Sequence, residues 1–257
     1  NDLEKKMQKW IKQNVNAKTS AITIPVVVHV VYKNNIENIS DAQIHTQIDV
    51  LNEDFRRLNQ DASNTPFDFL PFAADMQIEF CLAKRYLGVP TNGIVRKQTN
   101  LPEIPLYSDS IFFTQMGGSS AWNTNRYLNI WVCNLTNSQG GQTLGYAYLP
   151  GQQSQAWTAW KDGLVVDYSY FGTVGNAATT SNNDGRTPTH EIGHYLGLKH
   201  TFCEQTDAQG NTICCDNDNT SGGGYVDDTP AQKDIYWGSV NSSTNNNTGN
   251  DTQFSNA

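Results

Sequence analysis

Runs of apolar and β-branched residues along the chain predict the strands of one sheet. The longest run, TIPVVVHVVY at 23–32, is long enough for a central strand that is buried on both faces. Shorter runs predict further strands at 76–83 (MQIEFCLA), 127–133 (YLNIWVC), 143–150 (TLGYAYLP) and 163–172 (GLVVDYSYFG). Gly and Pro interrupt the stretch from 84 to 126, which we therefore expect to be mostly loops.

Apolar residues at helical spacing predict three helices. The first covers 2–13, and the third covers 188–196 after a loop rich in Asn, Gly and Thr. The second begins at a capping box formed by Ser40 and Gln43 and ends near residue 57. Its buried face would consist of Ile44, Ile48, Leu51 and Phe55.

A strand, a helix and a further strand in succession indicate a mixed α/β (α+β) fold. We expect residues 1–21 to form an N-terminal helical segment and residues 22–197 to form a sheet-and-helix lobe. Periodicity stops after residue 201, so residues 198–257 are expected to form an irregular lobe. No internal repeat is visible in the sequence.

Composition excludes two classes of partner. The 257 residues carry a net charge of −8, with only 16% charged residues and no block of Lys and Arg, so binding to a phosphate backbone is excluded. No apolar run approaches the roughly 20 residues that would span a bilayer. No signal for oligomerisation stands out, and we expect a monomer.

The five cysteines fall into two groups. Cys81 and Cys133 lie in predicted strands, where we expect buried thiols. Cys203, Cys214 and Cys215 lie in a polar stretch where a disulfide is expected, with Cys203 pairing to either of the other two. This cluster, the abundance of uncharged polar residues and the first residue, Asn rather than Met, predict a processed, secreted protein.

Three of the five histidines fall within the motif HEIGHYLGLKH. His190 and His194 are four residues apart, so on a helix they share one face and can reach one zinc ion. Glu191 is rotated from His190 by about 100°, which places it to act on a water at the metal. Gly197 can adopt a positive φ that ends the helix and brings His200 round as a third ligand. Three histidines leave a fourth position open, as catalytic zinc requires.

The motif matches the metzincin signature H-E-x-x-H-x-x-G-x-x-H, and the wider sequence resembles the pappalysin (cytophagalysin, ulilysin) family of metzincins. The matching stretches are IPVVVHVVY (24–32), LGYAYLP (144–150), DGLVVDYSYFG (162–172), GRTPTHEIGHYLGLKHTF (185–202) and VDDTPAQ (226–232).

The resemblance implies that His190, His194 and His200 bind Zn2+ and that Glu191 is the general base. It also implies a metzincin-like fold: a twisted mixed sheet with a backing helix and an active-site helix, followed by a small irregular C-terminal lobe. The strand around LGYAYLP would be the rim of the cleft, where an extended peptide adds to the sheet edge.

The sequence departs from the family pattern after the third histidine. Metzincins have a Met-turn there, and a Tyr that stabilises the tetrahedral intermediate follows in this family. Met7, Met76 and Met116 all precede the motif, and the chain stops at Ala257. We therefore expect the natural protein to continue into the Met-turn, with a further cysteine to pair with the odd loop cysteine.

A calcium site is a second point on which the family pattern is incomplete. Related sequences carry an acid shortly before the DTP motif, where this chain has three glycines at 222–224. A Ca2+ site and a solvated acidic loop both remain open. The candidate oxygen ligands are Asp216, Asp218, Asp227, Asp228 and Thr229.

Four residues outside the motif are assigned structural roles. His29 lies within the central strand run, where we expect a hydrogen-bonded sheet residue and not a metal ligand. His45 is expected to be exposed on the second helix. Trp157 and Trp160 are expected to pack rather than to bind substrate.

The leading hypothesis is a secreted zinc endopeptidase that acts on proteins or peptides through a zinc-bound water and Glu191. The resemblance adds a preference for a basic residue just after the scissile bond. The alternative hypothesis is a metal-stabilised domain that binds extended peptides without cleaving them. A non-peptidase zinc hydrolase is disfavoured, because the peptide-binding rim strand accompanies the motif.

Overall fold

A computed structural model of the chain describes residues 9, 13, 20–137, 139–149, 159–180, 184–198 and 200. The chain divides into two compact units. The first consists of Asn1–Gln60 and Asp75–Gly197 and contains the sheet and both long helices. The second consists of Asp61–Ala74 and Leu198–Ala257. Most of the predicted helix at 2–13 and most of the predicted irregular lobe lie outside the described residues, so the predicted lobe boundaries remain predictions.

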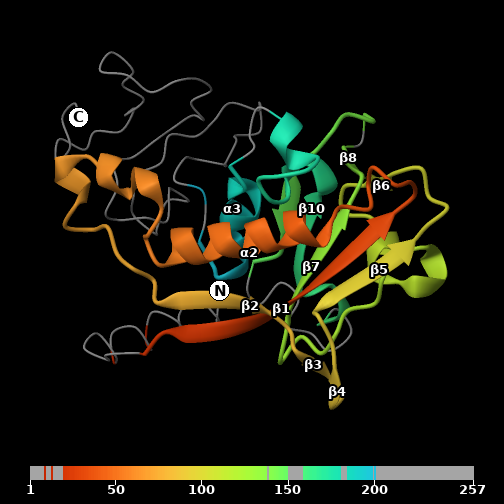
Figure 1. Ribbon diagram of the computed structural model, residues 1–257, viewed down its shortest axis with the longest axis horizontal. Helices are drawn as coiled ribbons and strands as arrows, with labels where there is room; N and C mark the ends of the chain where they lie inside the picture. Colours follow the sequence, from red (N-terminus) through yellow and green to blue (C-terminus); the bar gives the residue numbers. More distant parts are fainter. Residues whose placement is uncertain are drawn as a thin grey trace, which may run out of the picture. The chain divides into compact units, whose positions relative to one another are not determined.

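A six-stranded mixed sheet forms the centre of the first unit (Figure 1). Its strands run in the order β2-β1-β7-β10-β9, and β5 pairs with β1 on a branch from this path. All pairings are parallel except the one between β10 and β9, which makes β9 an antiparallel edge strand. The bounds are β1 Ile22–Tyr32, β2 Ile78–Leu82, β5 Ile94–Gln98, β7 Leu128–Cys133, β9 Gly145–Ala147 and β10 Gly163–Asp167.

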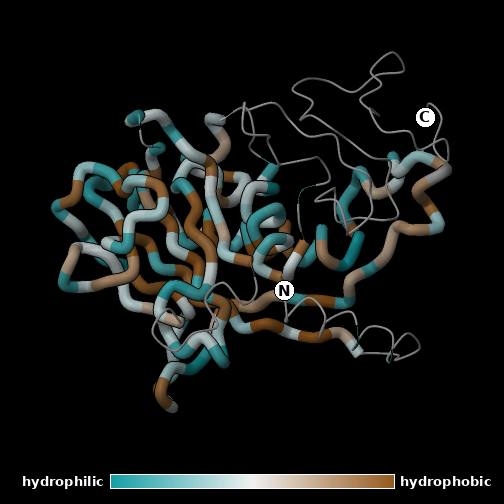
Figure 2. The backbone as a smooth tube through the Cα atoms, turned by 180° about the vertical axis from the view of Figure 1, so that it is seen from behind, coloured by the Kyte–Doolittle hydropathy of each residue, from teal (hydrophilic) through white to brown (hydrophobic). Residues whose placement is uncertain are grey.

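The long strand β1 is central because its apolar run can be buried on both faces. β1 pairs along its first half with β2 and along its second half with β5, while β7 pairs across its middle. Parallel strands of this kind need cover on both faces, which is why the run reads as continuous Val and Ile instead of an alternating pattern. Hydrophobic residues accordingly follow the central strands in Figure 2. The prediction of a mixed α/β fold with a twisted mixed sheet is confirmed.

Two helices, α2 (Asp41–Phe55) and α3 (Arg186–Tyr195), cover one face of the sheet (Figure 1). The apolar stripe of α2 packs on the even-numbered residues of β1, β7 and β10, and Ile192 of α3 joins the same core. Burying such stripes contributes about 25 cal/mol per Å² of apolar area. The helix α2 is therefore the backing helix that the sequence predicts, and it contacts α3 directly.

The predicted capping box at the start of α2 forms only in part. Ser40 is the N-cap residue, and its Oγ accepts a hydrogen bond from the Gln43 N–H at 3.1 Å, as expected. The reciprocal half of the box is wrong, because the Gln43 side chain does not turn back to Ser40. It bonds instead to the backbone of Tyr168, Phe171 and Asn176.

The predicted strand at 163–172 is too long, because β10 ends at Asp167. The buried Asp167 carboxylate accepts hydrogen bonds from the backbone N–H groups of Leu135 and Ser169, both at 3.0 Å, and from the Gln142 amide at 3.1 Å. Burial raises the pKa of this carboxyl group, and these hydrogen bonds lower it. Asp167 thus ends the strand by capping the short helix that starts at Tyr168.

The stretch from 84 to 126 holds more structure than its Gly and Pro content predicts. β5 lies within it and completes the sheet beside β1. Two small two-stranded sheets and a series of 3-10 helices account for much of the remaining irregular chain. Their bounds are β3 Arg85–Tyr86, β4 Val89–Pro90, β6 Ile104–Pro105, β8 Leu135–Thr136, η1 Gln60–Asn64, η2 Phe67–Phe69, η3 Asp109–Phe112, η4 Thr114–Met116, η5 Ala159–Lys161, η6 Tyr168–Tyr170 and η7 Ala177–Thr179.

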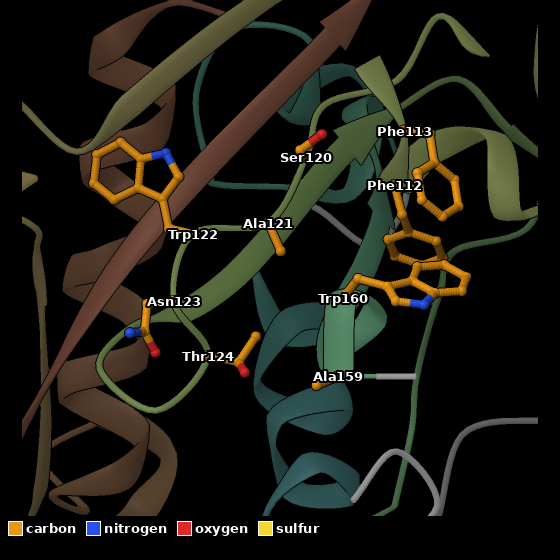
Figure 3. Close-up of a pocket in the computed structure, with 9 residues that line it drawn as sticks. All are labelled: Phe112, Phe113, Ser120, Ala121, Trp122, Asn123, Thr124, Ala159 and Trp160. Atoms are coloured by element: carbon orange, nitrogen blue, oxygen red, sulfur yellow. The ribbon is translucent and has the colours of Figure 1, made fainter. Parts of the chain in front are cut away.

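Among the described residues, the face of the sheet opposite α2 and α3 is covered by this irregular chain, including η3, and not by α-helices. Val31, Trp131 and Val165 pack there against Ile111 and Phe112. An open pocket of about 300 Å³ lies among aromatic rings in this region (Figure 3). Its lining consists of Phe112, Phe113, Ser120, Ala121, Trp122, Asn123, Thr124, Ala159 and Trp160.

The packing role predicted for Trp160 is confirmed, because its ring lies 4.5 Å from that of Phe113 and 5.6 Å from that of Phe112. Trp157 lies outside the described residues. His45 is exposed, as expected. Neither Cys81 nor Cys133 forms a disulfide; Cys133 is buried as expected, whereas Cys81 is only half-buried.

His29 is a hydrogen-bonded sheet residue, which confirms its predicted role. It is fully buried, and its Nδ1 lies 2.8 Å from Ser119 Oγ while its Nε2 lies 3.0 Å from Asn129 Oδ1. Asn129 also bonds both backbone groups of Trp122, a wall of the pocket in Figure 3. The imidazole stacks on Trp131 at a ring separation of 5.2 Å. Burial lowers the pKa of His29 to about 4.

Candidate active site

The helix α3 presents the residues of the zinc motif and has glycines at both ends. Gly185 is its N-cap residue, with a φ of 72° that favours glycine. After Tyr195 the chain leaves the helix, and Gly197 takes a φ of 103° with its N–H bonded to the His194 carbonyl at 2.9 Å. The predicted role of Gly197 in ending the helix is confirmed.

His190 and His194 project from the same face of α3, as their spacing predicts. Their Nε2 atoms lie 2.9 Å apart and their rings are 4.5 Å apart. With His200 they form a group whose possible ligand atoms all lie within 4.8 Å of one another. Zinc–nitrogen distances of about 2.0–2.1 Å place two tetrahedral ligands about 3.3 Å apart. This value lies between the 2.9 Å and 4.8 Å of the group, so side-chain rotations would let the three imidazoles share one zinc ion.

Glu191 lies next to this group but is not part of it. Only 7% of its surface is exposed, and its carboxylate accepts a hydrogen bond from the Ala147 N–H of the edge strand β9. Burial raises the pKa of Glu191 to about 7, and the Ala147 hydrogen bond acts in the opposite direction. The glutamate is thus held against β9, beside the histidine group.

Gly145 of β9 allows β9 and Glu191 to pack closely together. A Cβ atom at Gly145 would lie 3.0 Å from the Val165 carbonyl oxygen and 3.2 Å from Glu191 Cγ. These contacts are tighter than most Cβ contacts, so a side chain at this position would push Val165 or Glu191 away by a few tenths of an ångström.

We predict that Gly145→Ala lowers the free energy of unfolding by about 1–2 kcal/mol, because the added methyl group overpacks the contact. Under the hypothesis of a zinc endopeptidase, it should also slow peptide cleavage several-fold by moving Glu191, as kcat and thermal unfolding measured together would show. Gly140→Ala is the matched control: Gly140 has a φ of 78° and nothing within 4 Å of its Cβ position, so stability should fall without a change in kcat. Equal activity losses in the two variants would contradict this role of Gly145.

Polar residues of α2 that the sequence does not predict hold α3 in place. Asp54 accepts a hydrogen bond from Thr189 Oγ1 at 2.7 Å and lies 3.3 Å from Arg186 Nε. Gln47 bonds the carbonyl of Gly185 at 2.8 Å. Polar residues directly beside the apolar stripe of α2 were the available signal, but their partners lie more than 130 positions away along the chain.

Several predicted site residues lie outside the described residues and remain predictions. These are the calcium candidates Asp216, Asp218, Asp227, Asp228 and Thr229 and the disulfide candidates Cys203, Cys214 and Cys215. Among the described residues, the three histidines are the group that could hold a metal ion. The pocket in Figure 3 shares no lining residue with them.

A helix that carries two ligand-type histidines four residues apart, with the glutamate between them buried against an antiparallel edge strand, is typical of a metallopeptidase class of α/β domain. The profile of the peptidase M43 family, described as pregnancy-associated plasma protein-A, matches residues 115–257. The chain belongs to this family, and its resemblance to the pappalysins is confirmed.

Relatives of known name agree with this assignment. The structure of Tannerella forsythia mature mirolysin in complex with a cleaved peptide is 45% identical, with a TM-score of 0.74 over 84% of this chain and 74% of that one. An extracellular metalloprotease of Arthroderma otae is 29% identical over 87% of this chain and 64% of its own length. An extracellular metalloprotease of Arthroderma benhamiae is 28% identical over 83% of this chain and 60% of its own length. The chain therefore spans about three fifths of these curated relatives.

Proposed function

We propose that this chain is the catalytic part of a secreted zinc endopeptidase. His190, His194 and His200 would hold the zinc ion, and Glu191 would be the general base. The observation that supports this most directly is the position of Glu191, buried beside the histidine group and hydrogen-bonded to the backbone of the edge strand β9. Membership of the peptidase M43 family supports the same reaction.

Zinc, when bound, would supply a Lewis acid that lowers the pKa of a water molecule from about 15.7 towards 7. The chain's own contribution is to hold and move the proton. The Glu191 carboxylate accepts a proton from the attacking water and delivers it to the nitrogen of the leaving amine. The Ala147 N–H keeps this carboxylate oriented, and its burial keeps bulk water away.

The edge strand β9 would bind the substrate. In the described part of the chain β9 pairs with β10 on one side and ends the sheet on the other. An extended peptide can add to such an edge through backbone hydrogen bonds, which would place a scissile bond close to Glu191. The cleaved peptide bound to mirolysin supports a peptide substrate for this chain.

A preference for a basic residue just after the scissile bond is a finer proposal that rests on the family resemblance alone. Mapping the termini released from a denatured protein would test it. We expect Lys or Arg to be enriched at the new N-terminal position, and an even distribution of residues there would contradict the proposal.

Secretion is supported by relatives that are named extracellular metalloproteases. Neither long helix in the described residues has the length and apolar character that a membrane span requires. A calcium ion and a loop disulfide remain proposals without support from the described residues.

The competing proposal is a metal-stabilised peptide-binding domain without turnover. Its peptide site would be the same β9 edge, but cleavage would be absent even with zinc bound. The buried Glu191 favours the endopeptidase, since a binding domain has no use for a carboxylate kept out of water at a cost in desolvation.

The test is cleavage of an unfolded protein by the chain, with and without a zinc chelator such as phenanthroline. We expect the chelator to lower the rate at least 100-fold and added zinc to restore it, because the metal supplies several kcal/mol of transition-state stabilisation. Chelator already saturated with zinc is the matched control and should leave the rate unchanged. One bound zinc ion without any cleavage would favour the binding domain, and chelator-insensitive cleavage would contradict the zinc mechanism.

A further inference from the structure

The backing helix α2 carries a polar stripe beside its apolar one. Its polar members Gln43, Gln47 and Asp54 recur at helical spacing and share one face of the helix with the apolar Val50. This face contacts the loop that follows β10 and the first turn of α3.

Gln47 lies at the centre of this stripe and is fully buried. Its Nε2 donates to the Gly185 carbonyl at 2.8 Å, and its Oε1 accepts from the Gly172 N–H at 2.6 Å. Both glycines have positive φ values, 72° and 87°, so each is fixed in a conformation that other residues rarely adopt. The amide side chain of Gln47 thus joins Gly172, in the loop that follows β10, to Gly185 at the start of α3.

The start of α3 depends on such contacts, because its N-cap residue has no side chain. Asp184 supplies one bond to the Arg186 N–H at 3.2 Å, and Val50 lies against Gly185. One turn later Asp54 holds Thr189, the residue directly before His190. The helix that carries the zinc ligands is therefore fixed to α2 at two successive points, Gly185 and Thr189.

We propose that Gln47 is a positioning residue for the zinc site: by holding Gly185, it sets where α3 places His190 and Glu191 relative to β9. The inference rests on the proposed zinc peptidase function. Gln47 touches neither metal nor substrate, so its effect is transmitted through the first turn of α3. Residues that orient metal ligands indirectly affect metal affinity by about 10–100-fold.

The chain offers a matched control one helical turn away. Gln43 is buried and bridges in the same manner, with Nε2 donating to the carbonyls of Tyr168 and Phe171 and Oε1 accepting from the Asn176 N–H. All three of its partners lie in the loop after β10, and none belongs to α3. Removing either amide leaves comparable backbone groups unpaired, but only Gln47 reaches the active-site helix.

The experiment compares Gln47→Leu with Gln43→Leu in the full chain, measuring thermal unfolding, zinc affinity by competition with a chelator, and kcat and KM on a peptide. We expect both variants to lose similar thermal stability. Only Gln47→Leu should lower zinc affinity and kcat, each by at least tenfold, with KM little changed because β9 is intact.

A conservative variant adds a readout that loss of packing would not give. At neutral pH the Gln47→Glu carboxylate cannot donate to the Gly185 carbonyl. A protonated carboxyl group has one donor and one acceptor, as the amide pattern requires. We therefore expect kcat and zinc affinity of Gln47→Glu, relative to wild type at the same pH, to recover as the pH falls. If Gln47→Leu does not fold, the pH dependence of Gln47→Glu still tests the role of Gln47.

Equal losses of zinc affinity and kcat in Gln47→Leu and Gln43→Leu would overturn the inference, as would a pH-independent ratio for Gln47→Glu. Failure of the underlying function looks different, because wild type itself would then bind no zinc or cleave no peptide. If wild type binds zinc without cleaving, the zinc affinities alone still decide the role of Gln47.

Discussion

Replacing Glu191 with Gln is expected to reduce kcat by about 10²–10⁴-fold, the usual contribution of a positioned general base. Gln has nearly the same shape and its Oε1 can still accept the Ala147 hydrogen bond, but the neutral amide cannot take a proton from water. Zinc binding should be unchanged, because Glu191 lies outside the histidine group. Stability should be retained or increased, since an amide is less costly to bury than a carboxylate.

Kinetics on a peptide, zinc content and thermal unfolding of the same preparations would check this prediction. Glu53→Gln is the matched control, because it makes the same chemical change at an exposed position of α2. It should leave all three measurements unchanged. A Glu191→Gln protein that cleaves within tenfold of the wild-type rate would remove Glu191 from the mechanism.

The parts of the fold that sequence reasoning predicts well are those with a strong local signal. The Val-rich run of β1 and the apolar stripe of α2 were recognised because burial on two faces or on one imposes a distinct period. β5 was missed because the Ile94–Gln98 segment has only two apolar residues, and its conformation depends on pairing with the second half of β1. The end of β10 was misplaced because the buried Asp167, and not a Gly or Pro, terminates it.

The candidate site likewise contains residues that a local pattern predicts and residues whose roles depend on distant partners. His190, Glu191 and His194 lie within one helix, so their spacing alone predicts that the two histidines share a face and that Glu191 is rotated away from it. The roles of Gln43 and Gln47 depend on loops more than 120 positions away, and no local pattern encodes those partners. The capping-box prediction failed for this reason: Gln43 has the right spacing for the local bond, but bonds to Tyr168, Phe171 and Asn176 hold it elsewhere.

His29 is expected to make the protein lose stability in mild acid. Its pKa is about 4 in the folded protein against 6.5 for a free side chain, because burial disfavours the imidazolium ion. Below pH 6.5 the unfolded chain binds a proton that the native state does not bind until about pH 4. The contribution of His29 is therefore complete above pH 6.5 and is lost as the pH falls towards 4. At about 1.4 kcal/mol per pH unit the loss reaches about 3 kcal/mol.

Other buried groups change stability with pH in the opposite direction to His29. The measurement must therefore compare the unfolding free energies of wild type and a His29 variant at each pH. Burial raises the pKa of Glu191, Asp162 and Asp167, and carboxyl groups of this kind stabilise the native state as the pH falls. They are common to wild type and His29→Gln and cancel when the two unfolding free energies are subtracted at equal metal content.

We expect His29→Gln to be less stable than wild type at pH 7, because the bonds to Ser119 and Asn129 are disturbed. The difference in unfolding free energy between wild type and His29→Gln should shrink by about 3 kcal/mol towards pH 4, since the variant has no imidazole to protonate. Denaturant unfolding across this range would measure it. His45→Gln, at an exposed position of α2, is the control for the loss of a histidine without the loss of buried contacts. A His29→Gln gap that stays constant with pH would show that the buried imidazole accepts a proton in the native state as readily as in the unfolded chain.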